Sequence, residues 1–179
     1  MALTATIYNF DVELSNVDRN VYESFALKVA QHPSETDEYL LTRVLAYCLE
    51  YTEGIAFSRG LADPDEPTIA VRDLTGALKA WIEIGSPDAA RLHRASKAAP
   101  RVAVYTHKDP ARLIEQLAGQ RIHRADQIEI WALDRELIAE LVARRDRRTA
   151  FDLTVTERQL YLNIDGDSLE GTVVRHSLV

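Results

Sequence analysis

One short apolar segment that contains an acid constrains the fold of this chain most. Residues 81–84 are Trp-Ile-Glu-Ile, an apolar run that is typical of a buried strand. A carboxylate inside such a strand is costly unless a cation pairs with it or a metal binds it. Glu83 therefore requires a positively charged partner, and the fold has to bring that partner to the strand.

A second acid precedes the neighbouring predicted strand. Residues 68–72 and 79–84 have the pattern of two strands joined through Thr75-Gly76, which predicts a hairpin. Asp65 lies just before the first strand, and Glu83 lies near the end of the second, 18 residues later. Acids at these two places meet across an antiparallel pair, so together they could hold one divalent metal such as Mg²⁺.

Each acid also has a purely structural explanation. Residues 63–67, Asp-Pro-Asp-Glu-Pro, are rich in turn formers, so Asp65 could serve a turn alone. Glu83 could form a buried ion pair with Arg59 or Arg43 that holds the sheet to a helix. The residues themselves leave the metal site and these alternatives open.

The spacing of apolar residues in the first third of the chain predicts a strand and two helices. Alternation over residues 8–14 predicts the strand, and Tyr22, Phe25, Ala26 and Val29 have the spacing of a short helix. Ser34 is expected to cap the next helix, with Asp37 reaching back to it. Residues 40–48 supply that helix with a buried stripe.

Strands and helices are predicted to alternate through the rest of the chain. The expected elements are a strand at 55–58, a helix from Pro87 to about Lys97, a strand beginning at 102–104, a helix begun by Asp109-Pro110, a strand at 128–133 and a helix from Asp134. From Phe151 onward the period is two, with a turn at Asp165-Gly166, which predicts an antiparallel tail. These elements predict one α/β domain over residues 1–179, with a mixed β-sheet flanked by helices.

Composition limits the class of protein. The 179 residues are 46% hydrophobic and 27% charged, which is typical of one globular domain with a sizeable core. The single Cys48 excludes an internal disulfide and is expected to be a buried thiol in a reducing compartment. No window reaches the length of a membrane span, so we expect a cytoplasmic protein with no membrane partner.

The charge distribution bears on nucleic-acid binding. A formal net charge of −7 disfavours broad electrostatic attachment to nucleic acid, but it leaves room for a local basic patch. Residues 144–148, Arg-Arg-Asp-Arg-Arg, follow a predicted helix. They could interact with the dipole at the helix C-terminus or contact a phosphate.

Several other site classes find no support in the sequence. The five histidines show no pair at ligand spacing, and there is no neighbouring cysteine pair, so a zinc site is not expected. The chain has no glycine-rich nucleotide loop and no serine in a nucleophile-elbow context. Tyr105 and Trp131 lie in strand patterns and are expected in the core rather than as platforms for stacked bases.

Several separated motifs, in order, resemble the YaeQ family. They are ALTATIY at residues 2–8, HPSET at 32–36, SRGL at 58–61, DEP at 65–67 and WIEIGSPD at 81–88. The resemblance covers nearly the whole chain. It implies a fold similar to PD-(D/E)xK restriction enzymes, with a restriction-endonuclease-like core over about residues 34–106 and additional antiparallel strands. Members of that family are mostly of undetermined function.

The resemblance also implies roles for particular residues. Asp65 and Glu83 would be the catalytic carboxylates that bind Mg²⁺, and Glu35 would be placed like the helix acid that some of these nucleases add. The expected lysine, two residues after the second acid, is replaced by Gly85. Lys97 or Arg59 would then have to supply the missing positive charge.

Two classes of function follow from these observations. The first is a Mg²⁺-dependent phosphodiesterase or nuclease, or a protein that binds nucleic-acid phosphates. The second is a non-enzymatic regulatory or protein-interaction module that kept an inactivated nuclease scaffold, which Gly85 and the net charge favour. Whether the chain is an enzyme is left open, because fold does not imply function.

Overall fold

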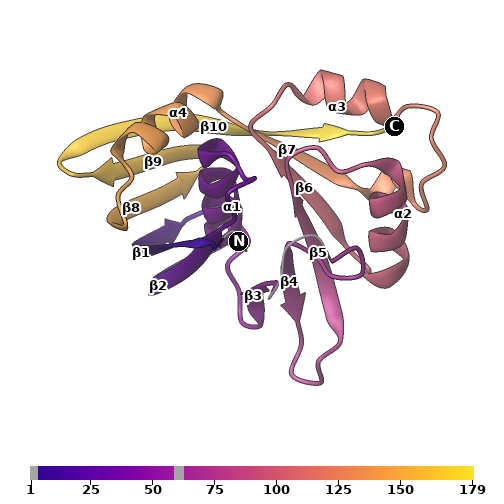
Figure 1. Cartoon of the computed structure of the whole chain (residues 1–179), viewed down its shortest axis with the longest axis horizontal. Coiled ribbons are helices and arrows are strands. Elements are labelled where there is room, and N and C mark those ends of the chain that lie inside the picture. The colour runs from indigo at the N-terminus through magenta and orange to yellow at the C-terminus, as the bar shows by residue number, and fades with distance from the viewer. Residues whose placement is uncertain (1–3, 59–62) are drawn as a thin grey trace. The chain divides into compact units, whose positions relative to one another are not determined.

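The computed structural model describes residues 4–58 and 63–179 of the chain. Its contacts divide the chain into two compact units, each made of segments that are distant in sequence. Unit 1 comprises Met1–Leu49 and Leu133–Val173, and unit 2 comprises Glu50–Ala132 and Val174–Val179. Each unit contains a mixed sheet with helices packed on it, so the chain is a mixed α/β protein (Figure 1).

Unit 1 is built on five strands in the order β2-β1-β8-β9-β10. Its elements are β1 (Thr6–Asn16), β2 (Val21–Gln31), α1 (Asp37–Leu49), α4 (Arg135–Arg144), β8 (Arg148–Thr156), β9 (Gln159–Ile164) and β10 (Asp167–Ser177), of which the last four residues belong to unit 2. β1 and β8 are parallel, whereas the other neighbouring pairs in this unit are antiparallel. The antiparallel tail predicted from Phe151 onward is confirmed.

One face of the unit 1 sheet is buried and the other is exposed. The buried side chains alternate along the strands as the period of two requires; they include Phe10, Val12, Leu14, Leu27, Val29, Phe151, Leu153, Leu160, Leu162 and Ile164. α1 and α4 lie against each other, and the predicted stripe of α1 from Leu40 to Cys48 is buried. At Gly171 in β10 an added Cβ would lie 2.9 Å from Leu137 of α4, so a glycine permits this close approach.

The helix expected over residues 22–29 is wrong, because this segment is strand β2. It pairs residue for residue with β1 over its whole length, from Val21 opposite Asn16 to Gln31 opposite Thr6. The apolar residues at 22, 25, 26 and 29 fit a helical period by chance. Burial follows a period of two instead, with Leu27, Val29 and Gln31 inside, because the tertiary pairing with β1 determines the conformation.

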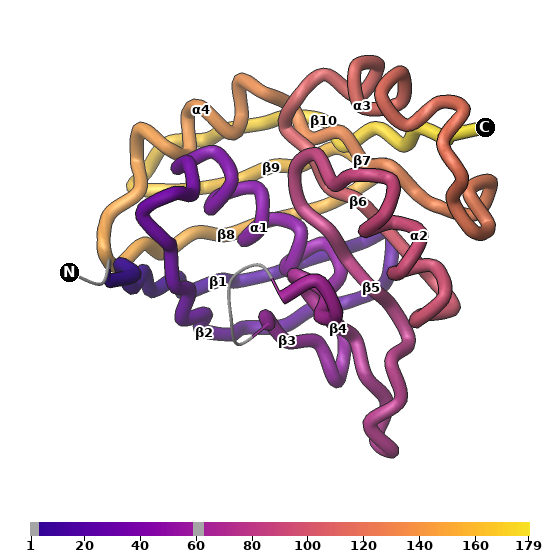
Figure 2. Tube along the Cα trace, turned by 45° about the vertical axis from the view of Figure 1, so that its right-hand side comes forward, coloured from indigo at the N-terminus to yellow at the C-terminus, as the bar shows by residue number. Residues whose placement is uncertain are grey.

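Unit 2 is built on strands in the order β7-β6-β5-β4-β3. Its elements are β3 (Ile55–Phe57), β4 (Ile69–Arg72), β5 (Leu78–Ile84), α2 (Ala89–Ala98), β6 (Val102–Thr106), α3 (Pro110–Leu117), the short 3₁₀ helix η1 (Ala125–Gln127) and β7 (Glu129–Leu133), whose last residue is in unit 1. β5, β6 and β7 are parallel, β4 and β5 form the predicted antiparallel hairpin, and β3 pairs antiparallel with β4 (Figure 2). All these strands and helices except η1 were predicted, to within a few residues.

A buried apolar cluster joins α2 and α3 to the sheet of unit 2. Its members are Trp81, Leu92, Ala95, Ala99, Val102, Val104, Leu113, Leu117, Ile128 and Ile130. Asp88 begins α2 by accepting a hydrogen bond from the backbone N–H of Arg91. The cluster therefore fixes the face of α2 that lies on β5, which is the strand that carries Glu83.

Among the described residues, none of the helices has the length and apolar character needed to cross a membrane.

Candidate functional site

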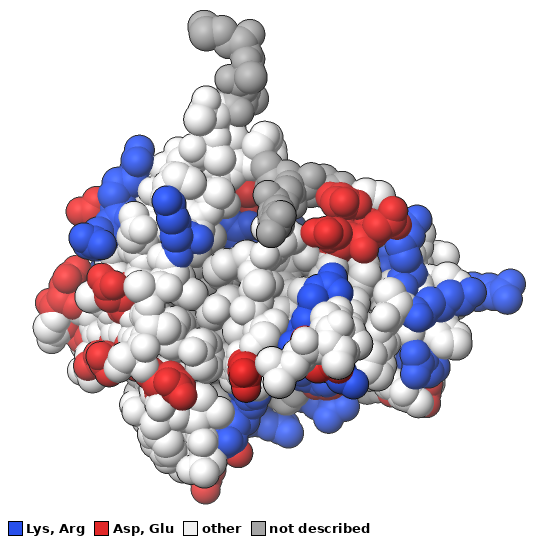
Figure 3. Space-filling model, turned by 90° about the horizontal axis from the view of Figure 1, so that it is seen from below, with Lys and Arg blue, Asp and Glu red and all other residues white. Residues whose placement is uncertain are grey.

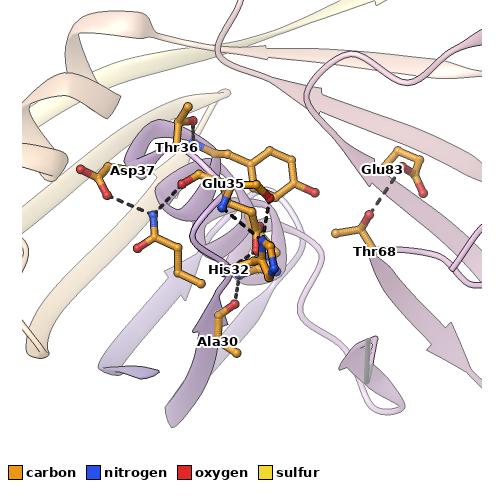
Figure 4. A network of polar contacts seen from close by, with 11 residues as sticks. Ala30, His32, Glu35, Thr36, Asp37, Thr68 and Glu83 are labelled. Atoms are coloured by element: carbon orange, nitrogen blue, oxygen red, sulfur yellow. Dashed lines mark hydrogen bonds and ion pairs between the residues drawn. The ribbon is translucent and has the colours of Figure 1, made fainter. Parts of the chain in front are cut away.

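Glu83 is buried in β5 and is held by three side chains. Its side chain is 5% exposed, and Nη2 of Arg91 lies 2.8 Å from Oε1. The indole N–H of Trp81 donates to the same oxygen at 2.6 Å. The hydroxyl of Thr68 donates to Oε2 at 3.5 Å, as Figure 4 shows. The negative charge of the buried Glu83 is therefore compensated by the guanidinium of Arg91.

Arg91 ties Glu83 to the segment that precedes β4. Its guanidinium lies 5.6 Å from the centroid of the Trp81 ring and donates to the carbonyl oxygens of Asp63 and Glu66, at 3.1 and 2.7 Å. The sequence-based alternative of a buried ion pair is thus found, but with another partner. Arg43 pairs with Glu35 in unit 1, and Arg59 lies outside the described residues.

Asp65 lies in a turn, as its structural explanation predicted. The carboxylate of Asp63 accepts the backbone N–H of Asp65 at 2.9 Å, which is a local turn contact. The Asp65 side chain is 80% exposed and lies 3.6 Å from Nε of Arg94 on α2. Each of the two expected metal carboxylates therefore faces an arginine. In the parts of the chain that the structure describes, no three acids, histidines or cysteines are placed to hold a metal ion.

The backbone at Gly85 explains why no lysine occupies that position. Gly85 has a φ of +87°, which lies in a region that residues with a Cβ rarely adopt. Its N–H donates to the carbonyl oxygen of Tyr105 at 2.8 Å, so this conformation is fixed by the neighbouring strand β6. The local backbone therefore disfavours a lysine at the position where the resemblance implies one.

Glu35 does not lie on the polar face of a helix, contrary to the expectation. α1 begins at Asp37, and Thr36 caps it by accepting the backbone N–H of Tyr39 at 3.1 Å. Ser34, the expected cap, bonds instead to the ring of His32. Glu35 turns back, so that its Oε1 accepts the backbone N–H of His32 at 2.8 Å (Figure 4).

The second oxygen of Glu35 has a cationic neighbour. Oε2 lies 3.6 Å from Nη1 of Arg43, and both side chains are about nine-tenths buried. This arrangement stabilises the turn between β2 and α1. The expected role of Glu35 in a metal site stays a prediction.

Lys97, the candidate replacement for the missing lysine, belongs to a group of basic side chains. It is exposed in the last turn of α2. The group, here called the α2–η1 cluster, consists of His93, Lys97, Arg121, His123 and Arg124. The ring of His93 accepts the backbone N–H of His123 at 3.0 Å, and Arg124 donates to the carbonyl oxygen of Ser96 at 2.6 Å. Figure 3 shows Lys and Arg side chains gathered at its right-hand edge, the side on which Figure 1 draws α2.

Electrostatics reflect the crowding of positive charge in this cluster. Partial desolvation lowers the pKa of His93, and Lys97, Arg121 and His123 lower it further because they repel a protonated ring. This cluster could not be predicted from the sequence, because its members come from two separate segments, α2 and residues 121–124. Only the packing of that loop against α2 brings them together.

A second polar network that the sequence did not indicate lies in unit 2. Arg101 donates to both oxygens of Glu50, at 2.6 and 2.9 Å, and to Glu129 at 2.8 and 3.0 Å. The hydroxyl of Tyr105 donates to Glu50 at 2.6 Å. Burial raises the pKa of Tyr105 well above its usual range, and the Glu50 carboxylate raises it further. The predicted core position of Tyr105 is confirmed, since it is 4% exposed, whereas Trp131 is only half-buried and stacks on the Tyr105 ring with centroids 6.2 Å apart.

The basic segment at residues 144–148 is occupied by local contacts. Arg144 pairs with Glu140 and Asp167, at 3.2 and 3.1 Å. Arg145 pairs with Asp37 and lies over the ring of Tyr8. These contacts favour the structural interpretation of this segment over a phosphate contact.

Comparisons with known proteins give one consistent result. A family model described as "YaeQ protein" matches residues 1–173. A relative named "Uncharacterized protein YaeQ" from Escherichia coli K12 is 35% identical over 172 residues, which cover 95% of this chain and 94% of the relative. A relative of the same name from Salmonella typhi is 33% identical over 171 residues, with 95% and 94% covered.

Two solved structures resemble the chain over nearly its whole length. The crystal structure of YaeQ protein from Pseudomonas syringae matches with a TM-score of 0.84 at 30% identity and covers 96% of this chain and 95% of its own. That of YaeQ protein from Xanthomonas axonopodis pv. citri matches with a TM-score of 0.86 at 31% identity and covers 97% and 99%.

Proposed function

The chain belongs to the YaeQ protein family, and the relatives named above carry no activity in their names. From the chain's own residues we propose that it binds nucleic-acid phosphates without cleaving them. The α2–η1 cluster is the proposed contact surface. The observation that carries the proposal is the convergence of Lys97, Arg121 and Arg124 with two imidazoles on one side of unit 2.

The chemistry of the cluster suits phosphate. Lys97 and Arg121 are exposed, and an arginine guanidinium binds phosphate oxygens in a bidentate manner. Such a cluster gives a chain of net charge −7 the local positive field that nucleic-acid binding requires. The lowered pKa of His93 supports the same proposal, because an imidazole that is disfavoured as a cation among cations becomes favoured when a polyanion binds.

The site around Glu83 supports the non-catalytic form of the proposal. A restriction-endonuclease-like core, with the hairpin of β4 and β5 followed by α2 and the parallel strand β6, remains our interpretation of the fold. On such a scaffold Glu83 is already neutralised by Arg91, and Gly85 occupies the lysine position in a backbone conformation that disfavours lysine. Mg²⁺ binding by Asp65, Glu83 and Glu35, with Lys97 or Arg59 as the catalytic cation, stays a prediction of the resemblance.

Fluorescence anisotropy with labelled single- and double-stranded DNA and RNA tests the binding. The double variant Lys97→Glu/Arg121→Glu is expected to weaken binding at least about tenfold and to reduce the slope of log affinity against log salt by about two. Arg148→Glu, an exposed arginine of unit 1, is the matched control and is expected to change neither. Equal binding by the wild type and the double variant would refute the proposal.

The catalytic alternative is tested on the same preparations. Titration calorimetry with Mg²⁺ and Mn²⁺, for the wild type and for Glu83→Gln, is combined with incubation of mixed nucleic acids. We expect no cleavage and no metal binding that depends on Glu83. Cleavage that requires Mg²⁺ and disappears in Glu83→Gln would replace the binding proposal by a rearranged nuclease.

A further inference from the structure

Among the described residues of unit 1, strand β2 pairs with a neighbouring strand on one side only, so that its other edge is long and unpaired. β2 ends the strand order of this unit, and it pairs with β1 over 11 residues without a bulge. Natural proteins usually protect such an edge with proline, a bulge, charged side chains or a very short strand. The charged residues of β2 are Glu23 and Lys28. β2 contains no proline, whereas β3, the last strand in the order of unit 2, has only 3 residues.

Hydrogen bonds identify which backbone groups of β2 point outward. The N–H groups of Asn9 and Val17 donate to carbonyl oxygens of Arg147 and Val155, on the side of β8. Odd-numbered residues of β1 therefore turn their backbone groups away from β2. Their partners in the register are the even-numbered residues of β2, such as Lys28 opposite Asn9. In an antiparallel ladder the two residues of a non-hydrogen-bonded pair both turn their N–H and C=O groups away from the partner strand. The even-numbered residues of β2 therefore point these groups toward its unpaired edge.

The outward groups have defined limits along β2. The carbonyl oxygen of Ala30 is taken up by Nη2 of Arg43 at 2.6 Å, which confirms the outward direction of the even positions and closes that end. Asn20 precedes the strand with a φ of +57° and closes the other end. The free ladder consists of Tyr22, Ser24, Ala26 and Lys28, all of them exposed.

This ladder is symmetric about Phe25, and we infer that it pairs antiparallel with the same strand of a second copy of this chain. In that register Tyr22 lies opposite Lys28 of the other copy, and Ser24 lies opposite Ala26. In this register all four residues form hydrogen bonds with the other copy. A two-fold axis at residue 24 would place Lys28 opposite Asn20, which lies outside the strand. An axis at residue 26 would place Tyr22 opposite Ala30, whose carbonyl oxygen already accepts a hydrogen bond from Arg43. The register is the best one available to two identical edges.

On the exposed face of the sheet, the facing side chains in this register are compatible. The Lys28 ammonium meets the phenol ring of Tyr22, a favourable cation–π arrangement, and no like charges lie opposite each other. On the other face the half-buried Phe25, whose ring centroid lies 6.0 Å from that of Tyr47 in α1, is opposite its own copy at the axis, and Glu23 is opposite Leu27. The proposed partner is thus a second copy, joined by main-chain hydrogen bonds that extend the unit 1 sheet.

The test is sedimentation velocity on the full chain over a range of concentration up to about 1 mM, since an interface of a single strand pair is small and weak. The wild type is expected to show a reversible monomer–dimer equilibrium. Ser24→Lys/Ala26→Lys places lysines opposite each other in the proposed register and is expected to raise the dimer dissociation constant at least about tenfold. Ser24→Lys/Ala26→Glu places opposite charges there and is expected to dimerise at least as well as the wild type.

Both variants change exposed side chains only, and circular dichroism checks that both are folded. A wild type that stays monomeric over the whole range would overturn the inference. A dimer that responds equally to the two variants would overturn it as well, because it would use another surface or register. Amide exchange gives an independent reading: the N–H groups of residues 22, 24, 26 and 28 are expected to gain protection on dimerisation, and their continued rapid exchange in the dimer would exclude this edge.

Discussion

Replacement of Arg91 by methionine measures how strongly Glu83 depends on its ion pair. Nη2 of Arg91 lies 2.8 Å from Glu83, and the two side chains are 22% and 5% exposed. At that separation the Coulomb attraction is about 6 kcal/mol for an effective dielectric constant of about 20. Removing one partner of a buried pair costs about 3–5 kcal/mol, since the other charge is left uncompensated. Because Arg91 is partly exposed and solvent screens its charge, the expected loss of unfolding free energy is at the lower end of this range, about 3 kcal/mol.

Arg94→Met is the matched control for this variant. Arg94 lies on the same helix and also donates to a carbonyl oxygen of the preceding segment, that of Pro64 at 3.1 Å. Its own ion pair, with Asp65 at 3.6 Å, is largely exposed, at 48% and 80% for the two side chains. Its loss is therefore expected to cost less than about 1 kcal/mol.

The assay is urea unfolding, followed by tryptophan fluorescence and by far-ultraviolet circular dichroism. Glu83→Gln/Arg91→Met completes a double-mutant cycle and is expected to be clearly more stable than the sum of the single variants predicts, by at least about 1 kcal/mol. Equal, small losses for Arg91→Met and Arg94→Met, or strict additivity in the cycle, would refute the conclusion that Glu83 is held by an ion pair.

Three further predictions concern stability and pH. Tyr105→Phe removes a donor to the buried Glu50 and is expected to cost about 1–2 kcal/mol, measured by thermal unfolding; no change would exclude a contribution of this hydrogen bond. Gly171→Ala places a Cβ 2.9 Å from Leu137 and is expected to cost about 1–3 kcal/mol in urea unfolding, whereas an unchanged unfolding free energy would show that this close approach does not constrain the residue. Hydrogen bonds from Arg145 and Gln31 lower the pKa of Asp37, so its contribution to stability is present above its unfolded pKa of about 3.9 and is lost as the pH falls through the lower folded value. In the variant Asp37→Asn the unfolding free energy is therefore expected to fall less steeply as the pH decreases below about 4. The same pH dependence in the variant and the wild type would contradict this assignment.

The sequence by itself determined the elements whose signals are local. Pro87, Asp109-Pro110 and Asp134 predicted the starts of α2, α3 and α4 close to their observed limits. Alternation predicted β8 and β9, because a strand with one buried face has to repeat every second residue. The cost of a buried carboxylate also predicted that Glu83 would be compensated.

Tertiary structure decided what depends on residues that are distant in the chain. It made β2 a strand, because pairing with β1 outweighs a spacing that also fits a helix. It chose Arg91 as the partner of Glu83, because α2 packs on β5 and presents this arginine to the carboxylate. It also brought residues 121–124 to α2, which created a cationic cluster in an acidic chain. Sequence periodicity reports which face of an element is buried, whereas the identity of the neighbour on that face depends on how the elements pack.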